Sequence, residues 1–201
     1  MKGNLKSFHL LLIIIFFTIT SCATTTFTSV WKDEGFNGPI DNVFVIGVFK
    51  ERDNVRTYEN EFVKQLSARG VNAIASYKEF GSGKLPEKKA IVSKMEELNM
   101  EAVLITNLVD KERRRVYKET WSQNYSHYYN TSYRTSTVEY IDDVYYLETK
   151  LYELRGEGLI WSALSKTLVL DKVVQSDVKE IKKFINFMVK KLSDDGMLKQ
   201  F

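Results

Sequence analysis

Two apolar runs rich in β-branched residues constrain the fold of this chain more than any other feature. They are VFVIGVF, from Val43 to Phe49, and EAVLITNLV, from Glu101 to Val109, and a shorter run covers Val71–Ser76 between them. Continuous apolar runs of this length are typical of strands that are covered on both faces. Such strands need helices on both sides, so the sequence predicts an α/β architecture.

Helical periodicity fills both gaps between these runs. The apolar stripe residues are Val55, Tyr58, Phe62 and Leu66 in the first gap and Ile91, Met95 and Leu98 in the second. Gly70 is placed to end the first helix in a left-handed turn, and Pro86 suits the start of the second. The order strand, helix, strand, helix, strand predicts parallel pairing with right-handed crossovers.

The second half of the chain has an antiparallel pattern. Lys111–Trp121 is expected to extend the third strand, and Val144–Leu154 with Leu159–Leu170 reads as a hairpin around Arg155–Gly158. A last amphipathic helix begins near Ser176 and ends at Gly196. The sequence therefore predicts a single α/β domain over residues 42–201. Its mixed, three-layer-like sheet has a parallel βαβαβ half and an antiparallel hairpin half, and the C-terminal helix packs on the sheet.

The first 21 residues have the pattern of a secretory signal peptide. MKGNLKSFHLLLIIIFFTIT combines a basic start with an apolar stretch from Leu10 to Ile19 and small polar residues after it. A membrane-spanning helix needs about 20 apolar residues, roughly twice the length of this stretch. An ordinary secreted protein and an uncleaved anchor remain the alternatives.

Ile19-Thr20-Ser21-Cys22 resembles the lipobox of bacterial lipoproteins, and Cys22 is the only cysteine of the chain. The resemblance implies that Cys22 is acylated and becomes the first mature residue, with acyl chains that tether the protein to a membrane. Ala23 stands where an aspartate would imply retention in the inner membrane, so we expect the outer membrane, facing the periplasm. Residues 22–41, which contain the stretch ATTTFTSVWKDEGFNGPI, are expected to be a flexible tether.

Two further stretches resemble known envelope proteins. Trp31-Lys32-Asp33, the run NVFVIGV and the spacing Arg56-x-x-Glu59 resemble a group of uncharacterised bacterial envelope lipoproteins. The hairpin Leu151–Ala163 is similar to one in periplasmic accessory lipoproteins, including the activators of peptidoglycan synthases and the curli secretion lipoprotein. The resemblance implies the fold and the compartment, and it carries over no catalytic residue.

The charge of the mature chain argues against a nucleic-acid partner. Removing residues 1–21 takes away Lys2 and Lys6 from the 29 basic residues and none of the 26 acidic ones, which leaves a net charge of +1. Nucleic-acid-binding domains are normally strongly basic.

Catalytic and metal-binding patterns are weak. His127 is the one histidine of the mature chain, and a Ser-His-Asp site could nominally combine it with Ser122, Ser126 or Asp142. Such a site needs a strained nucleophile turn, and no G-x-S-x-G motif occurs in the sequence. A zinc site needs clustered Cys and His residues, which one histidine and an acylated cysteine cannot provide. The carboxylates of Glu139, Asp142, Asp143 and Glu148 lack the glycine-centred loop of calcium sites. We therefore expect no catalytic residue, no metal and no enzyme activity.

Nucleotide-binding patterns are incomplete as well. Gly81–Lys84 reads GSGK, but Lys78 stands where a phosphate loop needs its first glycine, and Leu85 where it needs Ser or Thr. The turn Phe49–Asn54 lacks the glycines of a dinucleotide site. We expect no cofactor.

A tyrosine-rich segment, Ser122–Thr137, follows the extended third strand. Exposed Tyr and Trp are favoured in binding surfaces, so we expect a protein or glycan partner to be bound here. The candidate binding residues are Trp121, Tyr125, Tyr128, Tyr129 and Tyr133. The alternative is a long hairpin whose tyrosines cover a sheet edge or face. Arg113–Arg115 is either a basic patch or a set of charges that protects a sheet edge.

The sequence thus predicts a lipid-anchored envelope protein without enzyme activity, whose α/β domain binds another envelope protein. The alternative function is a receptor for peptidoglycan or another glycan.

Overall fold

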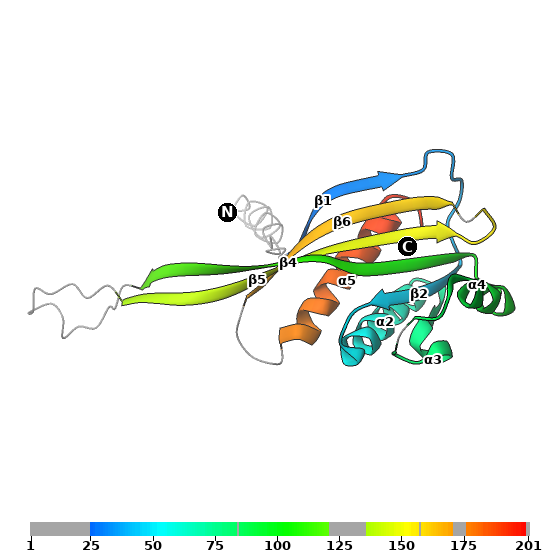
Figure 1. The fold of residues 1–201 in the computed structure, drawn as a ribbon. Helices are drawn as coiled ribbons and strands as arrows, with labels where there is room; N and C mark the ends of the chain where they lie inside the picture. The colour runs from blue at the N-terminus through cyan, green and yellow to red at the C-terminus, as the bar shows by residue number, and fades with distance from the viewer. Residues whose placement is uncertain (1–24, 84, 121–135, 157, 171–175, 200–201) are drawn as a thin grey trace, which may run out of the picture.

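The computed structural model describes residues 25–83, 85–120, 136–156, 158–170 and 176–199. These residues form one mixed sheet of six strands in the order β1-β6-β5-β4-β2-β3, with helices packed on it (Figure 1). The strands are β1 (Thr25–Lys32), β2 (Asn42–Val48), β3 (Asn72–Ala75), β4 (Ala102–Thr120), β5 (Ser136–Glu153) and β6 (Leu159–Leu170). The helices are α2 (Arg52–Ser67), α3 (Ser76–Phe80), α4 (Lys88–Glu97) and α5 (Ser176–Asp194).

The parallel half is built as predicted. β2 pairs in parallel with β3 on one side and with β4 on the other, and Val43 lies opposite both Ala73 and Ala102. Gly70 follows α2 with a φ of 72°, the left-handed conformation that glycine adopts at low cost. The predicted α/β fold with its mixed sheet is confirmed. One detail differs, because the segment after β3 that was expected to be a loop begins with the short helix α3.

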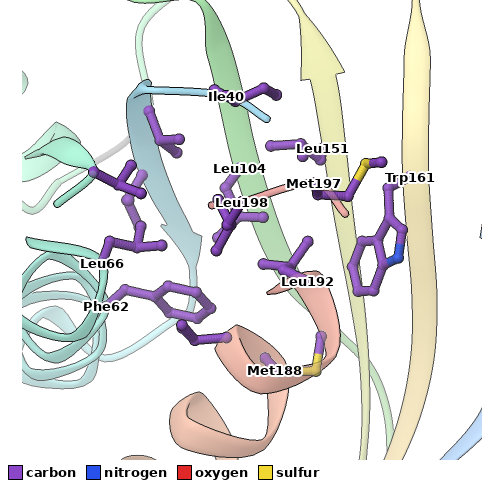
Figure 2. Packing of buried hydrophobic residues seen from close by; sticks show 14 of the residues in the cluster. Ile40, Phe62, Leu66, Leu104, Leu151, Trp161, Met188, Leu192, Met197 and Leu198 are labelled. Atoms are coloured by element: carbon purple, nitrogen blue, oxygen red, sulfur yellow. The ribbon is translucent and has the colours of Figure 1, made fainter. Parts of the chain in front are cut away.

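The two faces of the sheet are covered by different helices. Successive residues of a strand point to opposite faces, so Val43 and Val45 contact one layer while Phe44 and Ile46 contact the other. The first layer contains α2 and α5, and Figure 2 shows Phe62, Leu66, Met188 and Leu192 of these helices on the side of the sheet that carries Leu104, Leu151 and Trp161. The second layer contains α4, which contributes Met95. Burying each such large apolar side chain contributes about 1.5–3 kcal/mol of favourable transfer free energy.

The expectation that residues 22–41 form a flexible tether is wrong for the middle of that range. Residues 25–32 form β1, which pairs antiparallel with β6 from Thr25↔Thr167 to Lys32↔Trp161. A bulge between Phe27 and Ser29 shifts the register. The alternation of inward and outward side chains that marks a strand is therefore interrupted in this part of the sequence. The structure assigns these residues to the sheet because β6 offers them an unpaired edge.

Candidate functional site

The most unusual feature of the sheet is the length of its β4–β5 pair. The two strands stay paired from Ala102↔Glu153 to Thr120↔Ser136. β2 accompanies β4 only as far as Asn107, and β6 accompanies β5 only from Asp142 onward. Residues 115–120 and 136–141 therefore form a two-stranded ribbon, here named the arm, which extends away from the rest of the sheet (Figure 1).

A two-stranded ribbon by itself is marginally stable in water, so the arm depends on the sheet from which it continues. The sequence prediction that Lys111–Trp121 extends the third strand is confirmed through Thr120. The ladder shifts register between Leu108 and Asp110, next to the point where β2 ends. Bulges of this kind bend and twist a strand, which suits the transition from a covered sheet to a free ribbon.

On the α5 side of the sheet, a charged cluster lies where the arm begins. Oδ2 of Asp143 lies 2.7 Å from Nζ of Lys111, and Oδ1 accepts a hydrogen bond of 3.3 Å from Nε of Arg113. The hydrogen bond from Lys111 is the main cause that holds the pKa of Asp143 below its usual value, and the same bond raises the pKa of Lys111. Nζ of Lys111 also lies 4.7 Å from the centroid of the Tyr145 ring. These contacts join the residues of β4 and β5 that lead into the arm.

The opposite side of the sheet carries a second polar pair at the same level. Tyr146 donates its hydroxyl to Oε1 of Glu112 at 3.1 Å, and Nζ of Lys166 lies 5.9 Å from the Tyr146 ring centroid. Cations over aromatic rings at these distances contribute modestly when exposed to water. Both sides of the ribbon's origin thus present tyrosine next to a cation.

The arginine run Arg113–Arg115 lies where strand β4 has lost β2 as a neighbour. Strand edges that lack a neighbour are commonly protected by charge. The position therefore fits the edge-protection interpretation, and Arg113 is paired with Asp143 rather than gathered into a purely basic patch.

The predicted binding and lipid-attachment residues lie outside the described residues. These are Cys22, Trp121, Tyr125, Tyr128, Tyr129 and Tyr133. His127, Ser122 and Ser126 also lie outside them. The described chain enters that segment at Thr120 and leaves it at Ser136, which are paired at the end of the arm.

Of the acidic residues considered for calcium, Asp143 and Glu148 are not brought together. Asp143 and Glu148 are five residues apart on β5 and so point to opposite faces, and Glu148 pairs with Lys150 at 2.9 Å. In the part of the chain that the structure describes, no three His, Cys, Asp or Glu residues are grouped to hold a metal ion. Within the same residues, no helix is both long and apolar enough to cross a bilayer.

Sequence reasoning missed a buried carboxyl group, Glu59 of α2. Its Oε1 accepts hydrogen bonds from the backbone N–H of Gly47 at 2.8 Å and from the Ser76 hydroxyl at 2.7 Å. Its Oε2 accepts one from the backbone N–H of Tyr77 at 2.9 Å. Burial raises the pKa of Glu59, and these hydrogen bonds oppose that shift. The signal was present in the sequence, since Glu59 falls within the apolar stripe between Val55 and Phe62.

All three donors to Glu59 belong to the backbone or side chains of this fold, so the site has a structural explanation. β3 ends at Ala75, opposite Val45, and no longer accompanies β2 at Gly47. Glu59 supplies an acceptor at that point and joins α2, β2 and α3. A buried carboxylate that accepts several hydrogen bonds needs no substrate to account for it.

A groove of about 370 Å³ lies between α4 and the sheet. Its lining is largely apolar and includes Ile46, Ile91, Met95 and Val103. Ligand sites normally combine such a lining with several converging polar groups. Among the described residues, Lys88, Tyr152 and Glu153 are the polar members of this lining. The arm, rather than the groove, is therefore the better candidate for a functional surface.

Comparison with known proteins assigns no family. No family model matches the chain, and no curated protein matches it. Among solved structures it is similar to the PelC dodecamer from Paraburkholderia phytofirmans, with 12% identity and a TM-score of 0.46 over 86% of this chain and 99% of that one. It is also similar to the lipoprotein GNA1162 from Neisseria meningitidis, with 10% identity and a TM-score of 0.41 over 76% and 97%. A minor lipoprotein from Acinetobacter baumannii has 10% identity and a TM-score of 0.40 over 78% and 94%. At these TM-scores the likenesses carry no functional assignment.

Proposed function

We propose that this protein is a lipid-anchored envelope lipoprotein, held at the periplasmic side of the outer membrane through acyl chains on Cys22. It has no enzyme activity and binds another envelope protein through its β4–β5 arm. The lipobox-like sequence Ile19-Thr20-Ser21-Cys22 supports the anchor. The geometry of the arm supports the binding role.

The arm carries this proposal because of its unpaired edges. Residues 115–120 pair only with residues 136–141, so each strand of the ribbon has one edge without a strand neighbour among the described residues. Edge backbone groups are a ready template for pairing with an extended segment of another chain. A ribbon that leaves the covered sheet exposes such edges to a partner.

Site-specific crosslinking tests this proposal. A photo-crosslinking residue in place of Lys118, in the arm, should yield a discrete crosslinked protein in native membranes. The same residue in place of Lys89, which is exposed on α4, is the matched control. Equal crosslinking patterns from the two positions would contradict the proposal.

A variant with a shortened arm tests whether the arm is needed for partner binding. Arg114 and Asp142 are opposite each other in register, so an Asn-Gly turn can replace residues 115–141 between them. The shortened protein should keep its circular dichroism spectrum and membrane attachment while losing the partner. If partner binding persists, the arm is not the binding surface.

The glycan-receptor alternative rests on the tyrosine-rich segment. A variant in which Trp121, Tyr125, Tyr128, Tyr129 and Tyr133 are all replaced by Ser separates the two functions. Loss of retention on peptidoglycan with unchanged protein crosslinking would favour the glycan role.

A further inference from the structure

The lipid anchor and the sheet are separated by very little chain. Thr25 is the first residue of β1, and its hydroxyl lies 3.1 Å from that of Thr167 on β6. Thr25 is only 4% exposed, so its place in the sheet is fixed. Three residue steps lead from Cys22 to Thr25, and fully extended chain spans at most about 11 Å over that length. An acylated Cys22 therefore holds this end of the sheet close to the bilayer.

This short reach limits how the strands can be oriented. Thr25 is level with Tyr145 and Lys111, through the pairs Thr25↔Thr167, Thr167↔Tyr145 and Tyr145↔Lys111. The arm leaves the sheet at this same end, and the nine residue steps from Lys111 to Thr120 extend it by about 30 Å. Strands that stood upright on the membrane would drive the arm through the headgroups into hydrocarbon.

The sequence of the arm argues against such insertion. Residues 115–120 and 136–141 include Arg115, Lys118, Glu119 and Glu139. Charged side chains are costly within the hydrocarbon of a bilayer. The strands must therefore run roughly parallel to the membrane surface, with the arm lying along it.

Of the two faces of the sheet, one is available to lie against the membrane next to the anchor. The face that carries Trp161 and Leu151 is buried under α2 and α5. On the other face, α4 packs against residues of β2 and β4, such as Phe44 and Val103. Among the described residues, no helix packs on this face over β1, β6 from Ser162 and β5 from Tyr146 to Lys150, and the side chains there are half-buried or exposed. Toward the arm, Val144 of β5 is buried on this face.

The residues of this open sheet face have the chemistry of a membrane interface. The pairings Trp31↔Ser162, Lys150↔Ser162 and Tyr146↔Lys166 place their side chains on the same face. The face includes Trp31, Tyr146, Glu148, Lys150, Leu164 and Lys166, and Nζ of Lys150 lies 2.9 Å from the Glu148 carboxylate. Trp31 is 49% exposed, although it is a large apolar residue. Tryptophan and tyrosine favour the headgroup level of a bilayer, and lysine extends its ammonium group to lipid phosphates.

We propose that the open sheet face lies flat on the lipid headgroups of the bilayer in which Cys22 is anchored. This inference rests on the lipid anchor of the proposed function, and it adds an orientation for the whole domain. α2 and α5 then face away from the membrane. The arm runs along the surface, where it meets partners that are themselves in or on the membrane.

Fluorescence quenching in vesicles tests this orientation on the full, acylated protein. Because acylation consumes Cys22, an introduced cysteine is the one free thiol and accepts a single fluorophore. Lys150→Cys places the label on the open sheet face, and Asn186→Cys places it on an exposed position of α5. Phosphatidylcholine with a spin label on its headgroup should quench the label at position 150 severalfold more strongly than the label at position 186.

The outcomes separate the orientation from the anchor. Vesicle flotation and intact mass show first whether the acylated protein is membrane-bound, and failure there contradicts the lipid anchor. A membrane-bound protein that quenches equally at both positions, or more at position 186, overturns the orientation while leaving the anchor intact. Lys166→Cys and Lys190→Cys form a second pair of labels on the same two sides, in case one variant of the first pair unfolds.

Discussion

Oε1 of Glu59 accepts a hydrogen bond of 2.8 Å from the backbone N–H of Gly47, in the centre of the protein. Glu59 is completely buried, as are Val45 and Phe62 near it. The bond joins α2 to β2 just beyond the point where β3 ends. We therefore expect changes to this carboxyl group to lower the stability of the fold.

The first prediction concerns Glu59→Gln. An amide keeps one acceptor oxygen but turns an N–H toward a donor, such as the backbone N–H of Tyr77, so we expect a loss of about 1–3 kcal/mol in the free energy of unfolding. Urea unfolding monitored by circular dichroism measures this difference in the free energy of unfolding. Glu96→Gln, at an exposed position of α4, is the control for removing one charge and should change little.

The same pair of variants should reveal the raised pKa of Glu59. A carboxyl group with a raised pKa in the folded state binds its proton more tightly there than in the unfolded chain, so its contribution is present at low pH. That contribution is lost as pH rises from the unfolded value, about 4.3, through the folded pKa. The wild-type protein should therefore lose stability relative to Glu59→Gln as pH rises through this window. Parallel pH profiles would contradict the prediction.

Gly47→Ala should destabilise the protein for a steric reason. A Cβ at this position would lie 2.9 Å from Cε2 of Phe49 and 3.1 Å from Cδ1 of Tyr58. Overpacking of this kind costs about 1–3 kcal/mol in the free energy of unfolding. Gly158→Ala is the control, because a Cβ there meets no atom within 4 Å. Thermal unfolding compares them, and equal midpoints would refute the steric argument.

Tyr58→Phe should weaken the core through a hydroxyl chain. Tyr58 donates to Oγ1 of Thr106 at 2.6 Å, and Thr106 lies 2.8 Å from Oγ1 of Thr149. Burial raises the pKa of Tyr58, so its hydroxyl stays protonated and able to donate. We expect a loss of about 1 kcal/mol in the free energy of unfolding. Tyr77→Phe removes a hydroxyl that bonds Asn60 at an exposed position, and it should have a smaller effect.

Truncation of two tryptophans should change the free energy of unfolding to very different extents. Trp161 is completely buried, and its Nε1 donates to Oδ2 of Asp195 at 2.8 Å. Trp161→Ala should lower the free energy of unfolding by about 3–5 kcal/mol. Trp31→Ala, at a half-exposed position of β1, should stay within about 0.5 kcal/mol of the wild-type protein. Urea titrations decide this, and a large effect of Trp31→Ala would mean that β1 contributes more to stability than its exposure indicates.

Local sequence patterns were sufficient for the elements whose signals are local. β2 and the first part of β4 are apolar without alternation because both faces are covered. α2 was predicted from apolar residues at helical spacing, and the β5–β6 hairpin from the turn that contains Gly156 and Gly158. The extension of β4 into the arm was also predicted. The candidate aromatic residues that follow Thr120 in the sequence stay predictions, since they lie outside the described residues.

The sequence by itself therefore determined the α/β class, the parallel βαβαβ half and the hairpin half, because apolar periodicity is set by which sides of an element are covered. Only the tertiary structure decided that residues 25–32 join the sheet and which donors surround the Glu59 carboxyl group. Thr25 pairs with a residue 142 positions away, and no local pattern encodes a partner at that distance. The bond from Gly47 to Glu59 likewise depends on where β3 stops beside β2, which is a property of the assembled sheet.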